Sequence, residues 1–156
     1  TIFLDPVKNP TQYGVVELDK MNKIKKISEK PKKTNSNLAI TGLYLFNSKV
    51  VKLSEKLKPS KRNELEITDL IKSYKRKNLL RIEQIGRGGS WLDTGTAKDL
   101  FDASLFVSTI EKRQGLKIAC LEEIAFRNKW ITKNSIIKSI KFYGNCDYSN
   151  YLKKLM

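Results

Sequence analysis

Short apolar runs separated by polar turns fill the first third of the chain and predict β-strands. They cover residues 1–4, 13–18 and 24–28, with the polar turn 19–22 between the second and third runs. Residues 38–46 form a nearly continuous apolar run, which is typical of a strand covered on both faces. These segments predict a sheet in the amino-terminal part of the chain.

Helical spacing of apolar residues begins after this last run. Ser48 is expected to cap a first helix that Pro59 ends. Thr96, paired with Asp99, and Gly115 are expected to cap the two ends of a longer helix. The pattern predicts further helices at 66–77, 96–113, 122–127, 133–140 and 148–155, with a strand at 79–85. Strands that alternate with helices and give way to a helical tail indicate an α/β or α+β fold with a mixed sheet.

The composition is that of a globular protein with enough apolar material for one core. The chain has 156 residues, of which 40% are hydrophobic and 30% charged. We expect a cytoplasmic protein, because the sequence shows neither a signal peptide nor a membrane span. The chain begins with Thr1 inside an apolar run, which suggests a piece of a longer protein.

Residue usage excludes several kinds of site. The sequence has no histidine, which rules out a Cys/His zinc site and any histidine-based catalytic triad. Cys120 and Cys146 are expected to be buried free thiols. The net charge of +15 comes mainly from scattered lysines and indicates a solvated surface. Specific nucleic-acid binding is not expected, because aromatic residues do not interleave with the basic ones.

Three polar patterns are candidates for chemistry, although each has a simple structural explanation. Glu29 and Lys30 could mark a solvated strand end, Arg62 could be surface charge before a helix, and Asp93 could cap a helix. The glycine-rich loop at 86–89 lacks the lysine of a phosphate-binding loop. None of these patterns identifies a function alone.

Their combination and order are more specific. The sequence carries Tyr-Gly-Val-Val-Glu at 13–17, Glu-Lys-Pro at 29–31, Ile-Thr-Gly-Leu-Tyr at 40–44, Glu-Leu-Glu-Ile-Thr-Asp at 64–69, Trp-Leu-Asp-Thr-Gly-Thr at 91–96 and Arg-Gln-Gly-Leu-Lys at 113–117. Over nearly its whole length the chain thereby resembles the sugar nucleotidyltransferase family, and within it the glucose-1-phosphate thymidylyltransferases. The resemblance implies the carboxyl-terminal portion of a Rossmann-like nucleotidyltransferase fold, followed by a helical tail.

The resemblance also implies a reaction and roles for individual residues. The reaction would transfer a thymidylyl group from dTTP to glucose 1-phosphate, giving dTDP-glucose for dTDP-rhamnose biosynthesis and releasing pyrophosphate. Lys30 and Arg62 would be catalytic and hold the sugar phosphate, and Asp93 would bind Mg²⁺. The chemistry agrees, because a phosphate needs cations and carboxylate oxygen suits Mg²⁺. The substrate-binding residues implied are Gly14, Glu29, Ile40, Tyr44 and Trp91.

A second, regulatory nucleotide site and a homotetramer are further implications of the resemblance. Residues 1–115 would form the sugar-phosphate part of the catalytic domain, and residues 116–156 would make oligomer and regulatory contacts. The regulatory site would include Arg87, Gly88, Cys120, Glu123, Ile124 and Arg127.

Asn63 stands where the resembled family usually has glycine, and asparagine tolerates a left-handed backbone better than most residues.

Two alternatives remain open. The nucleotide could be UTP, because the resemblance places the base-reading residues and the first metal aspartate before Thr1. For the same reason we expect that this chain alone does not turn over dTTP. The other alternative is a non-catalytic basic module for binding or assembly.

Overall fold

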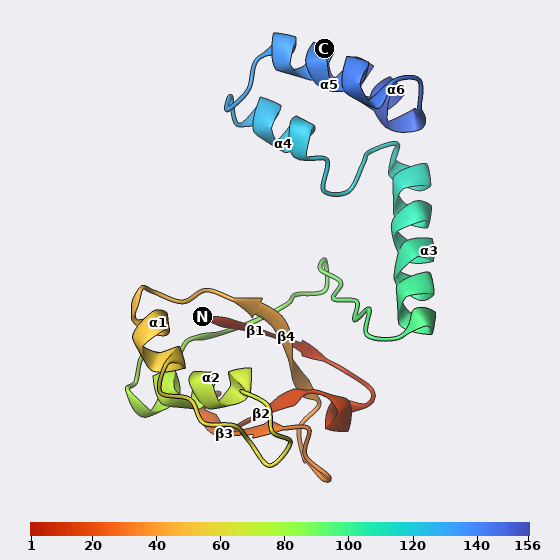
Figure 1. Ribbon diagram of the computed structural model, residues 1–156. Coiled ribbons are helices and arrows are strands. Elements are labelled where there is room, and N and C mark those ends of the chain that lie inside the picture. The colour runs from red at the N-terminus through yellow and green to blue at the C-terminus, as the bar shows by residue number, and fades with distance from the viewer. The chain divides into compact units, whose positions relative to one another are not determined.

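The computed structural model describes all residues from Thr1 to Met156. They form two compact units, Thr1–Trp91 and Leu92–Met156, which are described separately (Figure 1). None of the helices combines the length and the apolarity needed to cross a membrane.

A five-stranded mixed sheet forms the centre of the first unit, with strand order β3-β2-β4-β1-β5. The β1–β5 pair is parallel, while β4 pairs antiparallel with β1 and β2, and β2 pairs antiparallel with β3. The mixed sheet and its helices confirm the predicted α/β class. The strands are β1 (Ile2–Pro6), β2 (Gly14–Leu18), β3 (Ile24–Glu29), β4 (Leu38–Tyr44) and β5 (Ile82–Gln84), and a 3₁₀ turn, η1 (Pro10–Gln12), precedes β2.

Helix α2 (Ile67–Arg76) packs its apolar side on this sheet, and α1 (Lys49–Ser54) precedes it. Ile71 is fully buried in the middle of α2 and belongs to the same core cluster as the strand residues. Because Ile71 anchors the helix, the first turn of α2 lies against the β2–β3 hairpin. The strand residues of the cluster are Ile2, Leu4, Val16, Ile27 and Ile40.

Strand β4 departs from the prediction that both of its faces are covered. Ala39 and Ile40 are buried as expected, but Leu43 is 53% and Leu45 61% exposed. The change follows Gly42, whose φ of +80° lies in the left-handed region that favours glycine. The apolar run was correctly predicted as a strand, but only its first half is buried.

Two local predictions were also inexact. Ser48 makes no side-chain capping hydrogen bond, and instead Oδ1 of Asn47 accepts the backbone N–H of Lys49. Strand β5 is shorter than the predicted 79–85, because the N–H groups of Asn78 and Leu79 still bond to the carbonyls that end α2. The apolar pattern alone could not show that these residues close the helix.

The second unit is entirely helical. Its longest helix, α3, is capped as predicted: Oγ1 of Thr96 accepts the N–H of Asp99, and Gly115 adopts a left-handed φ of +69°. A smaller core holds the remaining helices together through Cys120, Ile136, Tyr151 and Leu152. The helices are α3 (Ala97–Gln114), α4 (Leu121–Arg127), α5 (Lys133–Tyr143) and α6 (Asp147–Lys153).

The two cysteines occupy different environments. Cys120 is buried, as expected, and its sulfur lies 3.2 Å from the hydroxyl of Tyr148. Cys146 is exposed, so the prediction that both thiols are buried is wrong for this residue. Its sulfur lies 3.4 Å from the hydroxyl of Ser149 and accepts the N–H of the same residue at the start of α6. Hydrogen bonds to the Ser149 hydroxyl and N–H lower the pKa of the Cys146 thiol. A polar capping role therefore explains its exposed position.

Candidate functional site

The β2–β3 hairpin brings Gly14 directly opposite Glu29, at the end of the sheet where β3 finishes. A β-carbon on Gly14 would lie 2.9 Å from Cγ2 of Thr68, 3.3 Å from Oε2 of Glu29 and 3.3 Å from Cδ1 of Ile40. The structure thus gathers residues from two adjacent strands, from β4 and from the first turn of α2. Three of the predicted sugar-contacting residues, Gly14, Glu29 and Ile40, lie together in this small space.

Replacing Gly14 by alanine should disturb this packing. A β-carbon 2.9 Å from Cγ2 of the buried Thr68 forces a shift, and overpacking of this kind costs about 1–3 kcal/mol in unfolding free energy. Urea denaturation of the G14A variant measures the loss. Gly86→Ala is the matched control, because a β-carbon there has open space around it. Equal stability of the two variants would contradict the close approach.

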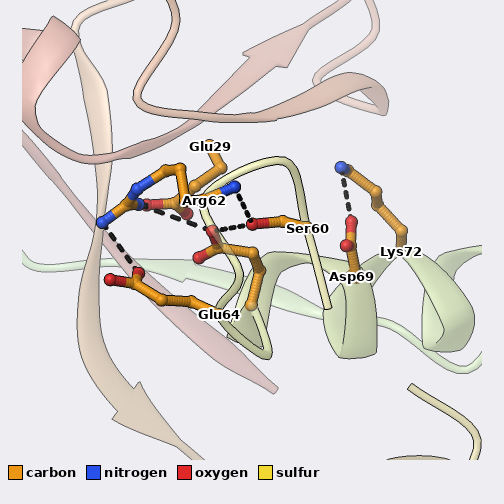
Figure 2. Close-up of polar contacts among 7 residues, drawn as sticks. Glu29, Ser60, Arg62, Glu64, Asp69 and Lys72 are labelled. Carbon is orange, nitrogen blue, oxygen red and sulfur yellow. Dashed lines mark hydrogen bonds and ion pairs between the residues drawn. The ribbon is translucent and has the colours of Figure 1, made fainter. Parts of the chain in front are cut away.

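Arg62 lies next to this group of residues and is surrounded by carboxylates (Figure 2). Its Nη2 is 2.8 Å from Oε2 of Glu64, and its Nη1 is 3.5 Å from Oε1 of Glu66 and 3.8 Å from Oε1 of Glu29. The guanidinium is therefore held beside the end of β3, within reach of the same carboxylate that lies against Gly14. Two residues proposed for different parts of one substrate, Glu29 and Arg62, are brought together by tertiary structure.

The loop that carries Arg62 uses a left-handed residue. Asn63 has φ of +59° and its N–H donates to the carbonyl of Ser60, which closes a tight turn. Asparagine is among the residues that occupy this region most readily. Asparagine at position 63 is thus compatible with the turn.

Lys30 follows Glu29 directly and has an uncommon backbone conformation. Its φ is +36°, and its N–H donates to the carbonyl of Tyr13, the residue before β2. The side chain is exposed and makes no ion pair, unlike Arg62. An ammonium without a protein partner at this position can approach an anionic ligand.

Two aromatic residues lie at the edges of the site. Trp91 contacts Tyr13 edge to face, with ring centroids 5.3 Å apart, and Tyr13 precedes Gly14. Tyr44 stacks on Phe46 at 5.8 Å. Burial raises the pKa of Tyr44, and the negative charge of Glu29 raises it further. Tyr44 therefore stays a neutral hydroxyl at physiological pH and can donate a hydrogen bond.

Thr68 is a site residue that sequence reasoning missed. It is 1% exposed, its methyl group faces Gly14, and its buried Oγ1 has no hydrogen-bond partner. A buried hydroxyl without a partner is uncommon, because desolvation is normally compensated by a hydrogen bond. The sequence held a weak signal, a polar residue within the apolar pattern of the helix that starts at Ile67, but its significance depends on the contact with Gly14.

Asp93 belongs to the second unit, in the segment before α3. Its side chain is exposed, and Oδ1 accepts the N–H of Thr94. No cluster of three or more carboxylates and thiols able to hold a metal ion occurs in the chain. A single carboxylate with its other oxygen available nevertheless fits Mg²⁺, which typically takes one or two carboxylates together with phosphate oxygens.

The residues predicted for a regulatory site fall in both units. Arg87 and Gly88 lie in the loop after β5, in the first unit. The other four are at α4 in the second unit, where Glu123 accepts hydrogen bonds from Arg127 and from the hydroxyl of Tyr151. Cys120 is buried at the start of this helix and Ile124 is exposed.

Similarity to known proteins extends over the whole chain. Residues 1–110 match the family model described as nucleotidyl transferase. The glucose-1-phosphate thymidylyltransferase of Neisseria meningitidis serogroup A / serotype 4A is 42% identical over 156 residues, which are 100% of this chain and 54% of the relative. That of Xanthomonas campestris pv. campestris (strain B100) is 44% identical over 99% of this chain and 52% of the relative. The chain spans about half the length of the curated relatives it matches.

Solved structures agree with the fold. A Bacillus anthracis protein crystallised with sucrose, provisionally described as a glucose-1-phosphate thymidylyltransferase, matches with a TM-score of 0.60 and 39% identity, over 67% of this chain and 42% of that one. A UDP-glucose pyrophosphorylase in complex with UDP-glucose matches with a TM-score of 0.60 and 25% identity, over 69% of this chain and 43% of that one.

Proposed function

Since this chain belongs to the nucleotidyl transferase family, we propose that it forms the sugar-phosphate half of a glucose-1-phosphate thymidylyltransferase. The observation that carries the proposal is the position of Arg62, whose Nη1 lies 3.8 Å from Oε1 of Glu29. The carboxylate of Glu29, which can accept hydrogen bonds from sugar hydroxyls, thus lies beside the guanidinium of Arg62, which can bind a phosphate. Glucose 1-phosphate has both groups in one small molecule.

The sugar would be bound at the end of the β2–β3 hairpin. Glu29 accepts hydrogen bonds from sugar hydroxyls, and Gly14, which has no side chain, lets Glu29, Ile40 and Thr68 come close to the strand end. Tyr44 can donate a hydrogen bond from its neutral hydroxyl. Ile40 contributes backbone and apolar surface, and Trp91 supports the edge of the site through Tyr13.

In the proposed reaction a phosphate oxygen of glucose 1-phosphate attacks the α-phosphorus of dTTP. The new P–O bond forms as the bond to the pyrophosphate oxygen breaks, and pyrophosphate leaves. Arg62 and Lys30 hold the attacking phosphate in line and offset its charge, which is how phosphoryl-type transfers are catalysed. Asp93 would hold Mg²⁺, which when bound neutralises charge between the two phosphate groups.

Thymine recognition and the other metal ligands are proposed to lie outside this chain, in the part of the relatives that it does not match. We therefore propose that these 156 residues do not catalyse the reaction by themselves. The full-length enzyme is proposed to be a cytoplasmic homotetramer. Residues 116–156 would make its oligomer contacts, and the residues around α4, with Arg87 and Gly88, would form a regulatory nucleotide site.

A nucleotide panel tests the proposal. The full-length enzyme is incubated with glucose 1-phosphate, Mg²⁺ and either dTTP or UTP, and nucleotide sugar and pyrophosphate are measured. We expect dTDP-glucose to be the main product, and no product from residues 1–156 alone. A preference for UTP would favour uridylyl transfer, the activity of the matched pyrophosphorylase. No product with either nucleotide, together with steeply salt-dependent binding to DNA or RNA, would favour a basic binding module.

A further inference from the structure

We propose that Glu66, acting through Ser60, is the residue that positions Arg62 for the sugar phosphate. The inference rests on the proposed function, because it concerns the same phosphate-binding group. Glu66 is 8% exposed, which is unusual for a carboxylate, and its side chain makes no capping hydrogen bond to the helix it precedes. Its side chain is directed instead at the loop that carries Arg62.

Ser60 connects the buried carboxylate to the backbone of Arg62 (Figure 2). The hydroxyl of Ser60 donates to Oε1 of Glu66 at 2.8 Å and accepts the backbone N–H of Arg62 at 3.1 Å. The backbone of Ser60 donates to the carbonyl of Glu64 at 2.8 Å and accepts from Asn63 at 2.9 Å. One serine therefore holds the turn at several points, and its hydroxyl is oriented by Glu66.

The same carboxylate oxygen also attracts the guanidinium. Nη1 of Arg62 lies 3.5 Å from Oε1 of Glu66, so one atom contacts the side chain of Arg62 directly and its backbone through Ser60. Glu66 itself is held at the beginning of α2, where its carbonyl accepts the N–H of Asp69. Since α2 is anchored in the core by Ile71, the position of Arg62 is coupled to the sheet that presents Glu29.

Burial distinguishes Glu66 from the other carboxylate in the loop. The side chain of Glu64 is 56% exposed, whereas that of Glu66 is 10% exposed. An exposed ion pair is weakened by solvent and salt, so an incoming phosphate can displace Glu64 from Arg62. A buried carboxylate that is also bound by a hydroxyl stays in place. Glu66 therefore orients Arg62 in both the free and the substrate-bound enzyme, while Glu64 neutralises it only in the free enzyme.

A double-mutant cycle in the full-length enzyme tests the coupling. Glu66→Gln keeps an acceptor for Ser60 but removes the negative charge that attracts the guanidinium of Arg62. We expect kcat/KM for glucose 1-phosphate to fall about 10- to 100-fold, the range typical of hydrogen bonds to charged groups. In an enzyme that already carries Arg62→Ala, the same change should alter kcat/KM by less than about twofold, because Glu66 acts through Arg62. The KM for dTTP should stay within about twofold in both.

Two further variants keep the test decisive. Ser60→Ala removes the bridge but leaves the carboxylate, and should lower kcat/KM about 2- to 10-fold in the wild-type background only. Lys72→Gln is the control, because Lys72 forms a 2.8 Å ion pair with Asp69 on α2 and does not contact Arg62; its kinetics should match the wild type. Thermal unfolding of each variant detects loss of folding.

The outcomes separate this inference from the proposed function. If Glu66→Gln and Ser60→Ala lower kcat/KM by the same factor with and without Arg62, or have no effect at all, the positioning role is overturned. If Arg62→Ala itself leaves kcat/KM for glucose 1-phosphate unchanged, it is the phosphate-binding role of Arg62 that fails.

Discussion

The R62A variant of the full-length enzyme is expected to lose about 100- to 1000-fold in kcat/KM for glucose 1-phosphate, by analogy with removal of one preorganised donor at a developing charge. The guanidinium offers a rigid fork that matches phosphate oxygens, and it is already held next to Glu29 before the substrate arrives. Its removal also leaves Glu29, Glu64 and Glu66 without their shared cation, so the site would repel the phosphate. Steady-state kinetics with varied glucose 1-phosphate measure the loss.

Arg62→Lys separates charge from geometry. Lysine retains the positive charge but cannot form two parallel hydrogen bonds, so we expect activity between those of R62A and the wild type. Thermal unfolding shows whether the three carboxylates destabilise the R62A protein. An R62A enzyme that is folded and retains kcat/KM within about twofold of the wild type would remove Arg62 from the mechanism.

Replacement of Ile71 by alanine should have the largest effect on stability. Ile71 is fully buried where α2 packs on the sheet. Truncation of a large aliphatic side chain at such a position typically costs about 2–5 kcal/mol in unfolding free energy. The cavity would also loosen the helix that carries Thr68 and begins next to Glu66. We therefore expect I71A to raise the KM for glucose 1-phosphate as well as to lower the midpoint of urea unfolding.

Ile67→Ala is the matched control on the same helix. Ile67 is 36% exposed, so the same truncation removes less buried surface and should cost under about 1.5 kcal/mol. Unfolding followed by circular dichroism measures both variants. Equal losses from I67A and I71A would contradict the assignment of Ile71 to the core between α2 and the sheet.

Local pattern was sufficient for most of the secondary structure. Apolar runs predicted the strands, and helical spacing of apolar residues predicted α2 and α3. Thr96 and Gly115 were recognised as caps because the groups they satisfy lie within four residues of them. Two predictions of burial failed: Leu43 is exposed although it lies in an apolar run, and Cys146 is exposed and accepts the N–H of Ser149, three residues away.

The sequence alone determined the family and the kinds of residue available for chemistry. Motif order identified Glu29, Lys30, Arg62 and Asp93 as candidates, and the absence of histidine excluded whole classes of mechanism. Both depend only on which functional groups are present and on their order along the chain.

Only the tertiary structure decided which of these groups act together. Arg62 is far from Glu29 in sequence, yet the two side chains meet because β3 ends beside the loop that leads into α2. The contact of Thr68 with Gly14 and the buried link from Glu66 through Ser60 to Arg62 likewise depend on strand register and helix packing. Register and packing are set by the burial of distant apolar residues such as Ile71, which no local pattern encodes.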